Sequence, residues 1–190
     1  MDTVLGLVGD GFVMIAADAT AARGICVLNH EQDKIVELDS SKMIGQSGPV
    51  CDTSNFSEYI QKNMTLYELN NNMQLSTHAT ANFMRRELAT ALRKGPYQTN
   101  ILLGGYDARA GASLFFLDYM SALQKVNFGA HGYASNFCLS TFDKEWKEGL
   151  DVDGARVIMD KCIAVLEKRF LISNPKFVIK VVDANGIRTL

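Results

Sequence analysis

The chain has 190 residues, of which 47% are hydrophobic and 21% charged, with 3 prolines and 15 glycines. This composition excludes a disordered tail, a collagen-like chain and a low-complexity linker, and the length suits one domain, residues 1–190, with a buried core. The 19 basic and 21 acidic side chains give a formal net charge of -2. Because the chain has no excess of positive charge to attract a phosphate backbone, we expect no nucleic acid partner.

The chain also lacks signs of export or of a membrane span. No apolar segment approaches the length that crosses a bilayer, and the first residues carry no basic stretch followed by an apolar run. We therefore expect no membrane association and a reducing compartment. The four cysteines have no CxxC spacing and lie among apolar neighbours, so we expect buried free thiols at Cys26, Cys51, Cys138 and Cys162.

Short apolar runs dominate the first fifty residues and predict strands. The sequence Gly9-Asp10-Gly11 separates the first two runs, which is typical of an antiparallel hairpin. An antiparallel sheet is therefore expected early in the chain. The runs are 3–8, 12–17, 25–28, 34–38 and 43–45.

Two helices are predicted next, because the apolar period changes to three and four residues after Asp52. The second helix is expected to begin with Ser76 as its cap, to end near Leu92, and to be stopped by Gly95-Pro96. The apolar positions are Phe56, Tyr59, Ile60, Met64 and Tyr67 in the first helix, and Ala79, Phe83, Leu88 and Leu92 in the second.

Strands return in the second half, at 100–106, 113–119 and 123–127. A further helix is expected over 153–170, with Asp151 or Asp153 as its cap. Its apolar stripe comprises Ile158, Cys162, Val165 and Leu166. The strands 176–182 and 187–189 follow, joined through Asn185-Gly186, a pair that favours a type I′ turn.

This order of elements predicts two mainly antiparallel sheets with helices outside both, in a single domain. Common catalytic and metal-binding motifs are missing. The stretch around Ser47 resembles a nucleophile elbow but lacks its second glycine in register, so Ser47 is expected in a turn. We expect no metal site from the widely spaced His30, His78 and His131. The Asp151–Gly154 stretch lacks the remaining ligands of a calcium loop. The chain also has no glycine-rich phosphate-binding loop, so we expect no cofactor.

Three stretches near the amino terminus carry a family resemblance. Thr3-Val4-Leu5-Gly6-Leu7 is followed by Gly11-Phe12-Val13-Met14-Ile15-Ala16-Ala17-Asp18 and then by Asp33-Lys34-Ile35. With these residues the chain resembles the beta-type subunits of the 20S proteasome. The resemblance implies an α+β fold, the four-layer αββα sandwich of N-terminal nucleophile hydrolases, which agrees with the element order above.

Further stretches extend this resemblance over essentially the whole chain, and they are similar to non-catalytic subunits at the fourth position of the eukaryotic beta ring. They are 58–63, 80–86, 102–107, 130–133 and 168–170. The resemblance implies beta neighbours at the third and fifth ring positions, an alpha ring and an opposing beta ring as partners. It also implies a role in ATP- and ubiquitin-dependent protein degradation in the cytoplasm and nucleus.

Active members of this family begin with a threonine nucleophile, which a lysine and an aspartate assist. The resemblance aligns Lys34 with that lysine, Asp18 with that aspartate, and Asp2 with the nucleophile. A carboxylate attacks an amide poorly, so we expect no catalysis by Asp2. The alternative is an active threonine endopeptidase after unexpected processing to Thr3, although the family processes itself after a glycine and Asp2 stands at that place.

The other supporting residues of the family are mostly replaced. Tyr133 aligns with the turn serine and Phe170 with the second aspartate, while Ser173 is retained. Catalytic residues act as a unit, so the remaining ones contribute little once several are lost. This favours a non-catalytic, structural subunit. Asp18 and Lys34 would then form an ion pair between adjacent strands and hold their register.

A structural ring subunit acts through its interfaces. Candidate contact segments are the first helix with Tyr59 and Tyr67, and the carboxyl-terminal stretch through Leu190; alternatively, these aromatic side chains fill the layer between helix and sheet. A second alternative function is a free-standing chaperone or adaptor that reuses the fold.

Overall fold

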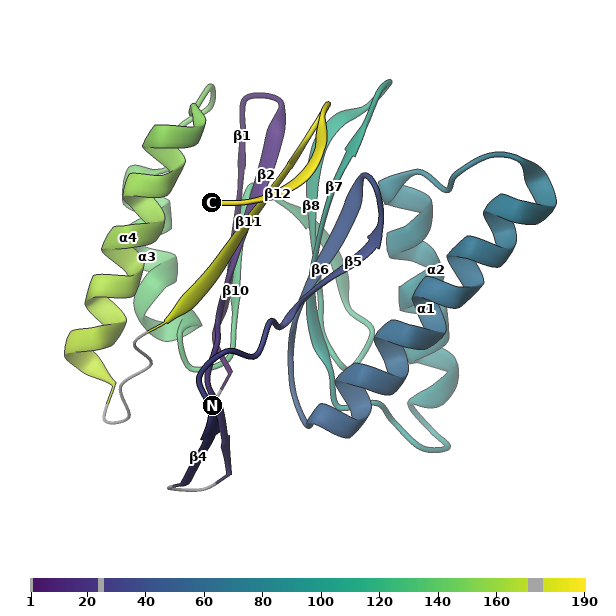
Figure 1. The fold of residues 1–190 in the computed structure, drawn as a ribbon, viewed down its shortest axis with the longest axis horizontal. Coiled ribbons are helices and arrows are strands. Elements are labelled where there is room, and N and C mark those ends of the chain that lie inside the picture. The colour runs from purple at the N-terminus through teal and green to yellow at the C-terminus, as the bar shows by residue number, and fades with distance from the viewer. Residues whose placement is uncertain (1, 24–25, 171–175) are drawn as a thin grey trace.

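The computed structural model describes residues 2–23, 26–170 and 176–190. Its helices and strands stack as helix, sheet, sheet and helix layers, which confirms the expected α+β sandwich (Figure 1). Every strand pair among these residues is antiparallel. No helix in this part of the chain is long and apolar enough to cross a membrane.

The first sheet combines the two ends of the chain. Its strand order is β10-β1-β2-β11-β12, and the helices α3 and α4 cover its outer face (Figure 1). The strands are β1 (Val4–Gly9), β2 (Phe12–Asp18), β10 (Phe128–His131), β11 (Phe177–Asp183) and β12 (Gly186–Thr189), and the helices are α3 (Ser135–Glu145) and α4 (Val152–Arg169).

The second sheet comes from the middle of the chain, in the order β5-β6-β7-β8-β9, and α1 and α2 cover its outer face (Figure 1). Its strands are β5 (Ile35–Asp39), β6 (Lys42–Ser47), β7 (Asn100–Asp107), β8 (Gly111–Leu117) and β9 (Leu123–Val126), with α1 (Val50–Asn71) and α2 (Thr77–Ala91). A separate hairpin of β3 (Ala21–Arg23) and β4 (Cys26–Asn29) projects from the body near the amino terminus.

Three apolar clusters fill the three spaces between the four layers. One lies between α3, α4 and the first sheet, one between the two sheets, and one between the second sheet and α1, α2. The two sheets approach closely at Gly45, where an added Cβ would lie 2.6 Å from Cγ1 of Val4 and 2.9 Å from Cγ2 of Ile15. A glycine is therefore required there for the sheets to meet.

Three elements differ from the sequence prediction, and one of them is the short strand β3, which lies outside the predicted runs. The run 123–127, expected as one strand, ends at Val126; after Asn127 the chain enters β10, so β9 and β10 belong to opposite sheets. The helix α3 was not expected. Its N-cap is Ala134, which offers no side-chain hydrogen bond, so the usual sequence signal for a helix start is missing.

Four local predictions need correction. Cys26 and Cys51 are exposed, because the projecting hairpin and the first turn of α1 leave their apolar neighbours in solvent as well; only Cys138 and Cys162 are buried. Ser47 is not in a turn but is the buried last residue of β6. The final hairpin forms as expected, but only Gly186 has a positive φ there, whereas a type I′ turn needs it at both central residues.

The buried side of α2 is also rotated from the predicted stripe. Leu88 is buried as expected, whereas Ala79, Phe83 and Leu92 are only partly buried. The buried residues of α2 are Thr77, Thr80, Ala81, Met84 and Leu88. Three of these five buried residues are threonine or alanine, and a pattern of large apolar residues at helical spacing does not include them.

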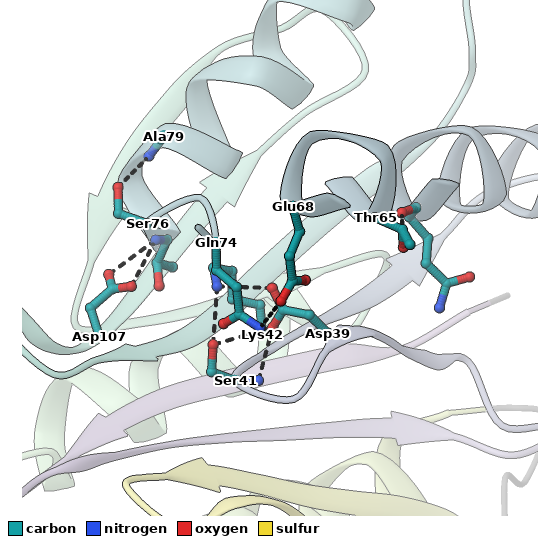
Figure 2. A network of polar contacts seen from close by, with 11 residues as sticks. Asp39, Ser41, Lys42, Thr65, Glu68, Gln74, Ser76, Ala79 and Asp107 are labelled. Atoms are coloured by element: carbon teal, nitrogen blue, oxygen red, sulfur yellow. Dashed lines mark hydrogen bonds and ion pairs between the residues drawn. The ribbon is translucent and has the colours of Figure 1, made fainter. Parts of the chain in front are cut away.

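The predicted helix caps are confirmed. The Ser76 hydroxyl accepts a hydrogen bond from the Ala79 amide at 3.1 Å, and Oδ1 of Asp151 accepts one from the Gly154 amide at 2.9 Å. Figure 2 shows that the start of α2 is also held by the sheet, since both carboxylate oxygens of Asp107 accept from the Thr77 amide.

The same end of the second sheet holds a buried ammonium group (Figure 2). Lys42 is 1% exposed, and its Nζ donates to Oδ2 of Asp39 at 2.9 Å and to the Ser41 hydroxyl at 3.0 Å. Burial of a lysine is tolerated only with such partners. Beside it, Gln74 donates to Glu68 at 3.0 Å and so ties the loop after α1 to the end of that helix.

His131 links the two sheets from β10. Its ring stacks on Phe116 with centroids 4.1 Å apart, and its Nε2–H donates to the Ile101 carbonyl at 3.0 Å. Burial lowers the pKa of His131 from 6.5 to about 4, although the Ile101 carbonyl and the Asp118 charge act in the opposite direction. The imidazole is therefore neutral in the folded protein near pH 7.

We predict that His131 makes the fold sensitive to mild acid. The unfolded chain takes up a proton at this histidine near pH 6.5 and the folded chain only near pH 4, so stability falls as the pH drops through this window. The difference corresponds to about 3 kcal/mol. Urea unfolding measured at several pH values checks this against His131→Phe, which keeps an aromatic ring but cannot titrate. If both proteins lose stability equally with falling pH, His131 is not responsible.

Candidate functional site

Three of the residues singled out by sequence meet at one point. Nζ of Lys34 donates to Oδ1 of Asp2 at 2.7 Å and to Oδ2 of Asp18 at 2.8 Å, and its third hydrogen bond goes to the Thr20 carbonyl at 2.9 Å. Asp18 is 1% exposed and the Lys34 side chain 9%. An ammonium group has three N–H donors, so all of them are used.

These residues come from different layers of the sandwich. Asp2 lies just before β1 and Asp18 is the last residue of β2; these two strands belong to the first sheet. Lys34 lies just before β5, which belongs to the second sheet. The ion pair between Asp18 and Lys34 thus forms, but the predicted placement on adjacent strands is wrong. The pair joins the two sheets and does not set the register of neighbouring strands.

The second carboxylate oxygen of Asp2 binds the backbone. Oδ2 accepts a hydrogen bond from the Gly48 amide at 3.1 Å. Gly48 has a φ of 147°, and an added Cβ would lie 2.1 Å from the Gln98 carbonyl oxygen, so only glycine fits. Sequence reasoning did not identify this residue as part of the site; a glycine between the end of a strand and Pro49 was the only available signal.

Thr3 does not join this cluster through its side chain. Its amide donates to Oδ1 of Asp18 at 2.7 Å, while its side chain is buried and its hydroxyl has no hydrogen-bond partner among the described residues. The three Lys34 donors bind Asp2, Asp18 and the Thr20 carbonyl instead. The Thr3 hydroxyl is therefore not hydrogen-bonded to Lys34.

A cleft of about 360 Å³ opens at the cluster. Asp2, Lys34 and Gly48 form part of its wall, together with residues of the projecting hairpin and of the first turns of α1. The remaining lining residues include Ala21, Ala22, Leu28, Gln46, Val50 and Thr53. The cleft is thus open to a ligand, but the group at its base that faces Lys34 is a carboxylate.

A second lysine crosses between the sheets near the first. Nζ of Lys180, on β11, lies 2.8 Å from Oδ2 of Asp33 and 2.8 Å from Oε1 of Glu37, on either side of the start of β5. Burial by itself lowers the pKa of Lys180, but the hydrogen bonds and charges of Asp33 and Glu37 outweigh it and raise the pKa. The two lysines therefore connect the same two sheets in opposite directions. Lys34 reaches from the second sheet to the first, and Lys180 reaches from the first sheet to the second.

The other residues aligned with the family's site do not join the cluster. Tyr133 is exposed, although its neighbour Gly132 packs against the backbone of Asp2, where an added Cβ would lie 2.1 Å from the carbonyl oxygen. The Phe170 ring packs edge-on against Phe137, with centroids 5.7 Å apart, in the layer beneath α3 and α4. Ser173 lies outside the described residues.

The chain is similar to known proteins along nearly its whole length. A family model described as "Proteasome subunit" matches residues 1–182. Proteasome subunit beta type-2-B of Arabidopsis thaliana is 50% identical over 188 residues, which cover 99% of this chain and 94% of that protein. Proteasome subunit beta type-2 of Dictyostelium discoideum is 41% identical over 193 residues, covering 100% and 97%, and that of Trypanosoma brucei brucei is 36% identical over 197 residues, covering 98% and 96%.

The cluster predicts that Lys34→Ala strongly destabilises the chain. Removing the ammonium leaves the Asp18 carboxylate buried without its countercharge, which costs at least about 3 kcal/mol. Urea unfolding of the isolated chain measures this loss. Adding Asp18→Asn to the Lys34→Ala variant should recover part of it, because the buried group is then neutral.

The matched control is Lys62→Ala. Lys62 pairs with Glu58 on α1, but both side chains are largely exposed, at 75% and 66%. A pair of this kind contributes no more than about 0.5 kcal/mol. Equal losses of stability in the two lysine variants would contradict a structural role for the buried cluster.

Proposed function

The chain belongs to the proteasome subunit family, in its beta-type branch, and from that premise we propose that it is a non-catalytic subunit. Such a subunit builds the beta ring that encloses the proteolytic chamber of the core particle. Its contribution to degradation is then structural: it spaces the catalytic neighbours and closes the ring.

The observation that carries this proposal is the bond between Asp2 and Lys34. A nucleophile needs an oxygen, sulfur or nitrogen that can attack and a base that can accept its proton. Here Lys34 Nζ holds two carboxylates and a carbonyl with all three donors, so it has no free electron pair to take a proton from a neighbouring group. The Asp2 carboxylate occupies the place where an attacking hydroxyl would be needed.

The alternative, an active threonine endopeptidase with Thr3 as nucleophile, has less support. The Thr3 side chain is buried and is not hydrogen-bonded to Lys34, and the Thr3 amide is bound by Asp18. An active Thr3 would thus need a rearrangement that brings its hydroxyl next to Lys34.

The subunit assembles with other proteasome subunits. We further propose the fourth position of the beta ring for it, between the third and fifth subunits, with an alpha ring and a second beta ring as its other neighbours. Support comes from relatives that carry the name beta type-2 along nearly the whole chain. On the same basis we propose that it works in ubiquitin-dependent degradation, in the cytoplasm and nucleus.

We predict that a threonine-directed covalent inhibitor leaves this chain unmodified in the purified particle. Intact-mass measurement of each subunit after treatment shows which chains gain the inhibitor. The catalytic subunits of the same particle serve as the internal positive control. A mass increase on this chain, together with an intact mass that matches a chain beginning at Thr3, would establish the peptidase alternative and overturn the non-catalytic assignment.

The native size of the protein separates a ring subunit from a free-standing chaperone or adaptor. We expect the endogenous chain to elute with the other proteasome subunits in a very large particle. Size-exclusion chromatography of a gently prepared extract, followed by immunodetection of the chain, makes this measurement. Recovery mainly as a monomer near its own mass of 20.9 kDa would favour the adaptor instead.

A further inference from the structure

Two of the four cysteines lie together in the core between α3, α4 and the first sheet. Cys138 is on α3 and Cys162 is on α4, and both side chains are fully buried in the same apolar cluster. The Cys138 thiol donates a hydrogen bond to the Cys162 carbonyl oxygen at 3.9 Å. Because α3 and α4 lie side by side, this contact joins two cysteines that are 24 positions apart in the sequence (Figure 1).

The two side chains also contact each other. A hydrogen bond with the Cys162 side chain raises the pKa of the Cys138 thiol, and burial and the electrostatic interaction with Cys162 act in the same direction. A hydrogen bond acts only between neighbouring atoms, so the two sulfur atoms face each other where the helices meet. Two facing thiols can be oxidised to a disulfide.

The two thiols differ in how firmly their helices hold them. Cys138 lies in the first turn of α3, whose N-cap Ala134 offers no side-chain hydrogen bond. Cys162 lies well inside α4, whose start is capped by the Asp151 carboxylate. An uncapped helix end opens more easily than the interior of a capped helix. Local opening at the start of α3 therefore exposes Cys138 to solvent while Cys162 stays in place.

We propose that Cys138 and Cys162 form a reversible disulfide between α3 and α4, with a low-molecular-weight disulfide such as oxidised glutathione as the oxidant. Cys138 reacts first, because opening of the α3 start exposes it and removes the burial that disfavours its thiolate. The inference does not depend on the proposed function, since both cysteines belong to this chain.

The exchange takes place in two steps. The Cys138 thiolate attacks one sulfur of the oxidant, so that a bond between protein and glutathione forms, the S–S bond of the oxidant breaks and one glutathione thiolate leaves. The Cys162 thiolate then attacks the Cys138 sulfur, and the second glutathione thiolate leaves. The two cysteine protons end on the two released glutathione molecules. The protein thus loses two electrons, and the oxidant gains them.

The disulfide closes a loop over 138–162, which contains the rest of α3, the connection to α4 and the first part of α4. A crosslink of this kind limits the conformations of the unfolded chain and so stabilises the folded one. We expect the urea midpoint of the oxidised chain to rise by about 1 M, and to return to its starting value after reduction.

The experiment equilibrates the full-length chain with glutathione mixtures of increasing oxidising strength. After an acid quench, free thiols are alkylated under denaturing conditions, and disulfide-linked peptides are identified by mass spectrometry. We expect one crosslinked pair of peptides, containing positions 138 and 162, which is lost on reduction. Because Cys26 and Cys51 are exposed and react by themselves, Cys26→Ser and Cys51→Ser are present in every protein tested.

Two matched variants test the order of the reaction. In Cys162→Ala, Cys138 should keep a bound glutathione, because no second thiol displaces it. In Cys138→Ala, Cys162 should be modified at least about tenfold more slowly, because the interior of α4 opens less often than the start of α3. Equal or faster modification of Cys162 would contradict the assigned order.

The crosslink itself is tested on the chain that keeps both thiols, so its outcome does not depend on whether either alanine variant folds. Free thiols at both positions in the most oxidising mixture, in a chain that remains folded, would overturn the proposal. A disulfide that forms only above the urea midpoint would overturn it as well, since the disulfide would then belong to the unfolded chain.

Discussion

The buried Lys34 ammonium group is the contact on which the arrangement of this end of the molecule depends. It connects the beginning of β1, the end of β2 and the approach to β5, and so joins the two sheets where the chain begins. A buried charge of this kind stabilises the fold only when its partners are complete. Asp2 and Asp18 supply two of them, and the Thr20 carbonyl supplies the third. Lys180 makes the reverse connection, from the first sheet to the start of the second.

Under the proposed non-catalytic function, this saturation gives Asp18 and Lys34 a structural role. Asp18 and Lys34 remain because removal of either would leave the other charged and buried. The Asp2 carboxylate then completes the lysine and binds the Gly48 amide with its other oxygen. Chemistry and stability make opposite demands on this lysine, since a base must be free of partners and a buried cation must be surrounded by them.

The layers of the fold and the contact between Asp18 and Lys34 could be predicted from the sequence, because apolar periodicity reports elements and the family resemblance aligned the two residues. The contact of Asp2 with Gly48 could not, since it joins residues 46 positions apart through the meeting of two sheets. Helix α3 begins without a side-chain cap, and β9 passes into β10 through Asn127 with no turn signal. The exposure of Cys26 and Cys51 depends on where their segments lie, which local composition does not report.

The order of strands in the first sheet has a consequence for the time course of folding. β2 lies between β1 and β11, where Val13 pairs with Val182, and β1 pairs on its other side with β10, where Val4 pairs with His131. As the chain is synthesised, the first hairpin emerges long before either flanking strand exists, and its unpaired edges stay open to other chains. Since β11, the partner of β2, follows α4 along the chain, this sheet closes late in synthesis.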